Sequence, residues 1–281
     1  MVVPARLAEI LAIRIAFAVG LLPVFGNPLM IKQFLRGVLK RFGIVAFKRS
    51  SRVYIPEDES YDIVARLIGR TDPIVVDGGA HMGDAVEHLA VLLPGAVFHC
   101  FEPDPTTSAI LLGKFADNSR VHVVQAALAD RLGTARLNIN ASRPTNSLLP
   151  RSESLEPALK ALSELVEQVD VQTTTIDDYC KLASVPRVDV LKLDLQGYDF
   201  LALQGATATL QQVRVVLVEV MFKEFYQGCH LFPDVLGLMI ASGFELHTLC
   251  GLHYGLDEEL LWSDAIFVKQ GSRAERTARS L

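Results

Sequence analysis

Short apolar runs alternate with longer amphipathic stretches from about residue 61 onward. The runs have the composition of strands buried on both faces, and the stretches between them have helical spacing. We predict strands over 73–77, 96–101, 121–128, 188–194 and 213–220, and helices over 62–69, 84–93, 106–118, 175–183 and 200–212. This alternation predicts an α/β doubly wound, mostly parallel sheet.

Two regions depart from the alternation. Residues 130–172 contain four scattered Gly and Pro residues, and the pattern there is irregular at first and then helical over 158–169. Such an interruption in a compact domain is usually functional. Near the end of the chain, a helix over 232–242 precedes strands over 243–249 and 263–270, which predict a C-terminal antiparallel hairpin.

The first 55 residues have a different character from the rest. An apolar run from Leu7 to Ile31 is interrupted by Arg14, Pro23 and Pro28, and basic residues follow as far as Arg52. A membrane span needs about 20 uninterrupted apolar residues, which this run lacks. We predict a helical N-terminal extension over 1–55 that precedes one domain over 56–281. The extension either packs on the domain or a second subunit, or lies peripherally on an anionic membrane surface through residues 7–52.

Composition narrows the possible partners. The 281 residues carry 27 basic and 32 acidic side chains, a net charge of −5, without a long basic block, which argues against a nucleic-acid partner. Four widely spaced cysteines form no CxxC pair, and this favours a reduced, cytoplasmic protein. The histidines at 81, 230 and 253 have no ligand spacing, so no metal site is predicted.

The residues that follow the first two strands carry the candidate chemistry. Ligands of doubly wound sheets lie outside the carboxyl ends of the strands. The first strand ends in DGGAHMG, residues 77–83, and the second in Glu102, Pro103 and Asp104. Glycines let the backbone turn sharply beside a ligand, and a carboxylate at 102 suits the two hydroxyls of a ribose. An adenosine cofactor is therefore expected.

Asp77 distinguishes between two adenosine cofactors, NAD and S-adenosylmethionine, that the glycine spacing alone does not distinguish. GGAHMG is a weak variant of the dinucleotide-binding GxGxxG. A carboxylate directly before the glycines would repel a pyrophosphate, whereas it suits a ligand with an ammonium group and a cationic sulfur. The sequence thus favours S-adenosylmethionine over NAD.

Longer segments extend this interpretation to most of the chain. In order from about residue 74 to 268 stand VVDGGAHMGD, FEPDP, AALADRLGTARLNI with Asn146-Ser147-Leu148 after it, TTIDDYC, VDVLKLDLQGYDFLALQGA, VVLVEV and SDAIFV. On these segments the chain resembles FkbM-type class I S-adenosylmethionine-dependent methyltransferases. The resemblance implies a Rossmann-like seven-stranded methyltransferase sheet. The chain departs from the family at Gln196 and Asp199, where Glu is more frequent.

The resemblance also implies roles for individual residues. The cofactor would contact Asp77, Gly78, Gly79 and Gly83 at its methionine end, Glu102 and Pro103 at its ribose, and Ala127 and Asp130 at its adenine. Asp194 would orient the acceptor hydroxyl or take its proton, and Lys192, two residues earlier on the same strand face, would tune it. His81 is a weaker candidate for a base on the substrate side.

Each residue also has a structural interpretation. Asp77 could cap the next helix, Glu102 could be a turn acid, Asp194 could pair with Lys192, and His81 could be a packing residue. Tyr198, Glu219, Tyr226 and His230 could rim an acceptor pocket or be ordinary surface residues.

Three functions follow from these interpretations. The first is an O-methyltransferase acting on a hydroxyl of a sugar, glycolipid or other small molecule. The second is a non-catalytic binding protein with this fold, and the third is an NAD-dependent oxidoreductase. The acceptor has no motif, and a homo-oligomer stays open.

Overall fold

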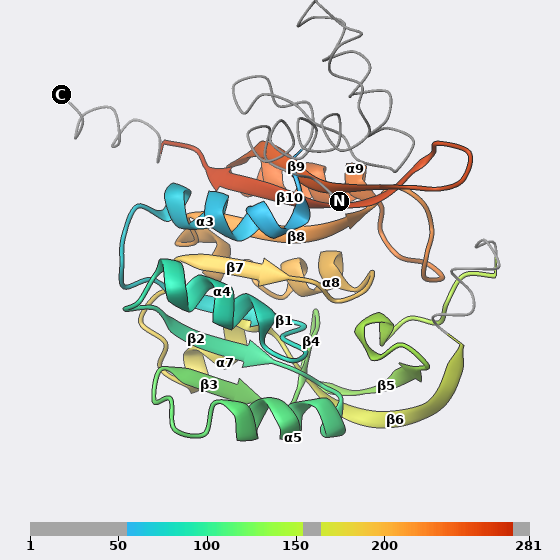
Figure 1. The fold of residues 1–281 in the computed structure, drawn as a ribbon, viewed down its shortest axis with the longest axis horizontal. Helices are drawn as coiled ribbons and strands as arrows, with labels where there is room; N and C mark the ends of the chain where they lie inside the picture. Colours follow the sequence, from blue (N-terminus) through green and yellow to red (C-terminus); the bar gives the residue numbers. More distant parts are fainter. Residues whose placement is uncertain (1–54, 154–163, 272–281) are drawn as a thin grey trace, which may run out of the picture. The chain divides into compact units, whose positions relative to one another are not determined.

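The computed structural model describes residues 55–153 and 164–271 (Figure 1). From Glu57 onward these residues belong to one compact unit. The predicted extension over 1–55 lies almost wholly outside the described residues, so the extension and its boundary stay predictions. No helix of the described part is both long and apolar enough to cross a membrane.

A seven-stranded sheet forms the centre of the described domain, in the order β3-β2-β1-β7-β8-β10-β9. Its strands are β3 (Val121–Val124), β2 (Val97–Phe101), β1 (Ile74–Gly78), β7 (Val190–Leu193), β8 (Val215–Met221), β10 (Leu260–Lys269) and β9 (Phe244–Tyr254). The first five run parallel, whereas β10 is antiparallel to both β8 and β9. The predicted doubly wound sheet and its late hairpin are confirmed.

Helices cover both faces of this sheet (Figure 1). One face carries α3 (Ser60–Ile68), α4 (Asp84–Leu92) and α5 (Pro105–Lys114), and the other carries α7 (Ile176–Leu182), α8 (Asp199–Gln204) and α9 (Phe232–Ala241). A large apolar cluster lies on the second face, where Leu193, Leu203, Phe244 and Phe267 are buried. The sheet is therefore buried on both sides, as its nearly continuous apolar strands predict.

The segment predicted as one strand over 121–128 is two strands. β3 ends at Val124, and β4 (Ala127–Leu128) joins a second sheet, of order β4-β6-β5. The amide of Ala126 donates to the Val124 carbonyl at 3.0 Å, and this tight turn redirects the chain. The redirection carries Ala127 and Leu128 over the end of the main sheet, toward the site described below.

The predicted helix over 158–169 is wrong for its described part. The second sheet contains β5 (Gly133–Asn140) and β6 (Leu165–Thr174), which pair antiparallel, with Leu137 opposite Val169. Val169 and Val171 alternate with polar residues, and they pack with Leu137 and Ile139 against Ala127. A period of two in 165–174 indicates this strand, but the sequence does not show which partner fixes its register.

The helix predicted over 200–212 is interrupted. α8 ends at Gln204, and a short 3-10 helix, η4 (Thr209–Gln211), follows. A side chain at Gly205 would place its Cβ 2.2 Å from the carbonyl oxygen of Ala129, so the backbones meet closely there. The Asp177 carboxylate then accepts from the amides of Ala208 and Thr209, both at 2.8 Å, and begins the second piece.

The strand order reverses between β1 and β7, which leaves a crevice at their carboxyl ends. Gly79 makes this junction possible. Its φ is +73°, and a Cβ there would lie 1.9 Å from the backbone oxygen of Asp194, just after β7. The glycine turn after β1 and the end of β7 are consequently in direct backbone contact, which places Asp194 beside the turn.

Candidate active site

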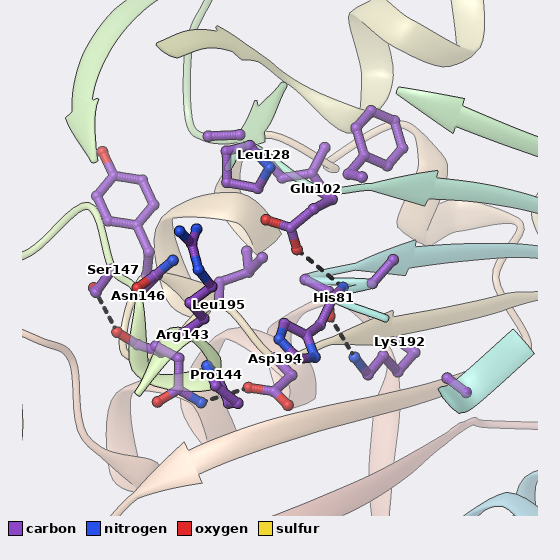
Figure 2. Close-up of a pocket in the computed structure, with 18 of the residues that line it drawn as sticks. His81, Glu102, Leu128, Arg143, Pro144, Asn146, Ser147, Lys192, Asp194 and Leu195 are labelled. Atoms are coloured by element: carbon purple, nitrogen blue, oxygen red, sulfur yellow. Dashed lines mark hydrogen bonds between the residues drawn. The ribbon is translucent and has the colours of Figure 1, made fainter. Parts of the chain in front are cut away.

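A pocket of about 360 Å³ opens at the carboxyl ends of β1, β2 and β7 (Figure 2). Its volume falls in the range of small-molecule sites, roughly 300 to 1,000 Å³. The turn after β1 contributes Gly79, Ala80 and His81, and the end of β7 contributes Lys192, Asp194, Leu195 and Gln196. The far wall is apolar, with Ala127, Leu128 and Leu137, and Glu102 and Pro103 lie between these parts.

Glu102 braces the turn that forms the pocket floor. Its Oε2 accepts from the amide of His81 and its Oε1 from the amide of Asp104, both at 2.9 Å. Burial raises the pKa of Glu102 to about 7, although these two hydrogen bonds oppose the shift. Each carboxylate oxygen has two acceptor positions, so both oxygens can still receive a ribose hydroxyl. The turn-acid interpretation and the predicted cofactor role are therefore compatible.

Asp77 lies beneath the pocket and does not line it. The carboxylate is 1% exposed, and the Lys192 ammonium is 3.1 Å from its Oδ1. The two residues are direct neighbours in the register of β1 and β7, which explains the ion pair. The interpretation of Asp77 as a helix cap is wrong, since α4 begins after Gly83 without a side-chain cap. Its predicted contact with the cofactor gains no support from this geometry and stays a prediction.

Lys192 forms its ion pair with Asp77, and not with Asp194 as one interpretation of the sequence suggests. The ammonium pairs with Asp77 and donates to the carbonyl of Gly79 at 3.1 Å. Burial alone would lower the pKa of Lys192, but the charges of Asp77 and Asp194 together raise it. Burial raises the pKa of Asp77, against the effect of Lys192. Lys192 is thus a buried cation that holds the ends of β1 and β7 together.

Asp194 follows β7 and faces the pocket (Figure 2). Its Oδ1 accepts a hydrogen bond from Nε2 of Gln196 at 2.7 Å. His81 lies on the same side of the pocket, with a φ of 45°, and burial lowers its pKa, which favours the neutral imidazole. A carboxylate held by a neutral amide can accept the proton of a hydroxyl.

The other predicted residues divide between the pocket and its surroundings. Pro103 and Ala127 line the pocket, whereas Gly78, Gly83 and Asp130 do not. A Cβ on Gly78 would contact Leu128 and Leu193 at 2.8 Å, and Gly83, with a φ of +84°, packs against Leu111 and Phe115. These two glycines allow close packing around the turn, and their predicted cofactor contacts, like that of Asp130, stay predictions.

The considered rim residues also differ from one another. Tyr198 lines the pocket, and Glu219 and Tyr226 reach it through hydrogen bonds with Gln196. His230 instead stacks on Phe200, with ring centroids 3.9 Å apart.

A loop between β5 and β6 supplies pocket residues to which sequence reasoning gave no role. Arg143, Pro144, Asn146, Ser147 and Leu148 line the pocket from this loop. The Arg143 guanidinium pairs with Asp104, and Ser147 Oγ donates to the carbonyl of Gln196 at 2.8 Å. Although burial opposes it, hydrogen bonds from Thr107 and Arg143 lower the pKa of Asp104. The only sequence signal was the resemblance at 146–148, because the loop has no spacing rule of its own.

The pocket fits an adenosine cofactor with a charged tail. Glu102 offers acceptors for ribose hydroxyls, Ala127, Leu128 and Leu137 form an apolar wall for a flat ring, and Gly79 lines the pocket from the turn after β1. Asp194 places a carboxylate at the other end of the pocket. The described residues contain no group of three or more His, Cys, Asp or Glu arranged to hold a metal ion. Fold and site together define the class I methyltransferase architecture.

Comparisons with known proteins agree with this class. A family model described as the methyltransferase FkbM domain matches residues 77–246. The 2-O-methyltransferase NoeI of Sinorhizobium fredii is 26% identical over 188 residues, covering 65% of this chain and 76% of that protein. The hexuronic acid methyltransferase AglP of Haloferax volcanii is 25% identical over 190 residues, covering 66% and 71% respectively. A crystal structure of methyltransferase FkbM from Methylobacillus flagellatus aligns with a TM-score of 0.42 at 13% identity, covering 85% of this chain and 70% of that one. A likeness that distant carries no argument about function.

The family match covers more than half of the chain, and the chain belongs to the FkbM methyltransferase family. It is an enzyme of the methyltransferase class, with S-adenosylmethionine as cofactor. This decides against the NAD-dependent oxidoreductase and the non-catalytic binding protein.

Proposed function

We propose that this enzyme transfers the methyl group of S-adenosylmethionine to a hydroxyl of a sugar, glycolipid or other small-molecule acceptor. The observation that carries the proposal is the carboxylate of Asp194, which faces the pocket at the end of β7 and is held there by Gln196. Hydroxyl groups are weak nucleophiles, and a positioned carboxylate can accept their proton as the new bond forms.

The cofactor supplies an electrophilic methyl group when it is bound. The protein's own task is then to align a nucleophile with that group and to remove a proton. Glu102 and the Gly79 turn line one part of the pocket, and Asp194 lines another. We assign to Asp194 the orientation of the acceptor oxygen. His81 is a second group on this side, and its lowered pKa leaves a nitrogen free to accept a proton.

The names of two relatives support a sugar hydroxyl as the acceptor. One relative is named a 2-O-methyltransferase and the other a hexuronic acid methyltransferase. Neither exceeds 26% identity, so they support the class of acceptor and not its identity.

The test combines cofactor binding with an acceptor panel. Calorimetric titration measures S-adenosylmethionine and S-adenosylhomocysteine binding, and release of S-adenosylhomocysteine reports turnover with neutral sugars, uronic acids and glycolipids. Asp194→Asn should lower kcat by about 10²- to 10⁴-fold while cofactor affinity stays within a few-fold. Asp170→Asn, an exposed change on β6, is the matched control. Undiminished turnover in Asp194→Asn would overturn the role of this carboxylate, and turnover only with nitrogen nucleophiles would overturn O-methylation.

A further inference from the structure

Four acidic side chains lie near Gln196, beside the pocket, and of these Asp199 is buried and the other three are half-buried. Asp194 and Asp199 lie close to Gln196 along the chain, Glu219 comes from β8, and Asp264 is opposite Glu219 in the register of β10 with β8. Burial first, and neighbouring acids second, raise the pKa values of Asp199, Glu219 and Asp264. The Lys192 ammonium is a nearby cation, and it lowers the pKa of Asp264 against the effect of burial.

Gln196 is clamped by hydrogen bonds from three sides. Its Nε2 donates to Asp194 Oδ1 at 2.7 Å and to Glu219 Oε2 at 3.1 Å, and its Oε1 accepts from the hydroxyl of Tyr226 at 2.6 Å. The amide orientation follows from this chemistry, because carboxylates accept hydrogen bonds and only the nitrogen can donate to both of them. Figure 2 draws the hydrogen bond that ends at Asp194 as a dashed line.

The backbone of Gln196 is held as tightly as its side chain. Its φ of 52° lies in the left-handed region, which is uncommon for a residue other than glycine. The carbonyl of Gln196 accepts from Ser147 Oγ at 2.8 Å, which ties the loop after β5 to the end of β7. A strained residue persists where its surroundings determine it from several sides, and such residues are frequent at functional sites.

We propose that Gln196 is a positioning residue that orients the carboxylate of Asp194 toward the acceptor. Its amide engages Oδ1 and leaves Oδ2 of Asp194 for the acceptor hydroxyl. Because the amide is a neutral donor, it bridges Asp194 and Glu219 without adding a negative charge between them. This inference rests on the proposed function, since it assigns the orientation of the same Asp194.

Titratable groups surround Gln196, so the effect of its neutral side chain can be measured through the pH dependence of stability and of kcat. Burial first, and neighbouring acids second, raise the pKa of Glu219 well above its ordinary value and that of Asp264 to about 7. Burial likewise raises the pKa of Asp199 to about 7. The other titratable and charged groups that interact with these acids are Glu57 of the short 3-10 helix η2 (Glu57–Glu59), Tyr61 of α3, Asp77 of β1, His81, Lys192 of β7, Tyr226 and Cys229.

The test is Gln196→Glu, which replaces the amide nitrogen by an oxygen with little change of shape. At low pH the introduced acid is protonated and can still donate to Asp194, whereas at higher pH it adds a third carboxylate to the pair. The melting temperature of the cofactor-free variant should match the wild type near pH 5 and fall progressively below it toward pH 8. Gln211→Glu, the same change at an exposed position of the short helix η4, is the control and should show no such trend.

Kinetics supply a second readout in the same variants. The introduced carboxylate adds a negative charge beside the reacting groups, so the acid limb of the kcat profile should move upward by about one pH unit or more. At pH 7 we expect kcat to fall by about tenfold while the KM for S-adenosylmethionine changes less than about threefold. Tyr226→Phe removes the hydroxyl that fixes the amide and adds no charge. It should lower kcat by a few-fold without moving the profile.

The outcomes separate this inference from the proposed function. A melting difference that is constant with pH, or a kcat profile identical to that of Gln211→Glu, would overturn the positioning role. If Gln196→Glu does not fold at any pH, an unchanged kcat in Tyr226→Phe would overturn it instead. Absence of wild-type turnover with every hydroxyl acceptor overturns the proposed function, and the melting experiment still decides about Gln196 because it needs no acceptor.

Discussion

The ends of β1 and β7 each carry an aspartate, Asp77 buried and Asp194 half-buried, and the two differ in the group that holds the carboxylate. Asp77 lies beneath the pocket against the ammonium of Lys192 at 3.1 Å. Asp194 faces the pocket and is held by the neutral amide of Gln196 at 2.7 Å. An acid paired with a cation joins two strands, whereas an acid paired with an amide keeps a charge that it can use. The sequence position of an acid after a strand therefore does not decide its role.

The largest expected effect on stability comes from removing the cation that pairs with Asp77 in β1. Lys192→Met leaves the Asp77 carboxylate buried without its cation, and we expect the free energy of unfolding to fall by about 3–5 kcal/mol. Urea denaturation followed by circular dichroism measures it. The double variant Asp77→Asn with Lys192→Met removes both charges and should recover a large part of the loss. A single variant within about 1 kcal/mol of the wild type would show that the pair does not stabilise the junction.

The register of the sheet explains why the sequence alone did not predict the partner of Asp77. DGGAHMG predicts a glycine turn at a strand end, and the structure has that turn. Lys192 stands far along the chain, and only the pairing of β1 with β7 brings it beside Asp77. The parallel strands, flanking helices and final hairpin were predictable because their patterns are local. The pairing of β6 with β5 and the position of Arg143 over the pocket depend on contacts between distant segments, which one sequence does not show.

A third acid, Glu102, extends the comparison. Its expected effect on stability is smaller and depends on pH. Glu102 is buried and held by two backbone amides, without Lys or Gln. Its pKa rises from 4.5 to about 7 on folding, so the folded protein binds more protons than the unfolded chain between these values. The stability contributed by the protonated form is complete below about pH 4 and is lost as the pH rises through about 7, by up to about 3 kcal/mol.

Glu102→Gln should remove this dependence from the cofactor-free protein. Asp199 and Asp264 titrate in the same direction, so the quantity to measure is the difference in unfolding free energy between variant and wild type from pH 4.5 to 8. The difference should shift in favour of the variant as the pH rises. Calorimetry should also show weaker S-adenosylmethionine binding. A difference that is flat with pH would mean that the two amides hold the charged form as well as water does.

The smallest expected effect on stability comes from Asp194 at the end of β7. A small effect is what the comparison with Asp77 predicts. Asp194→Asn keeps an oxygen that can accept from Nε2 of Gln196, and it removes one charge from a cluster that contains Asp199, Glu219 and Asp264. We expect the free energy of unfolding to rise or to stay within about 1 kcal/mol of the wild type, in the same denaturation experiment. A charge kept for chemistry is held against the repulsion of its neighbours, so its removal costs turnover and not stability. Loss of more than about 2 kcal/mol, comparable to the effect of Lys192→Met, would place Asp194 with Asp77 among the structural acids.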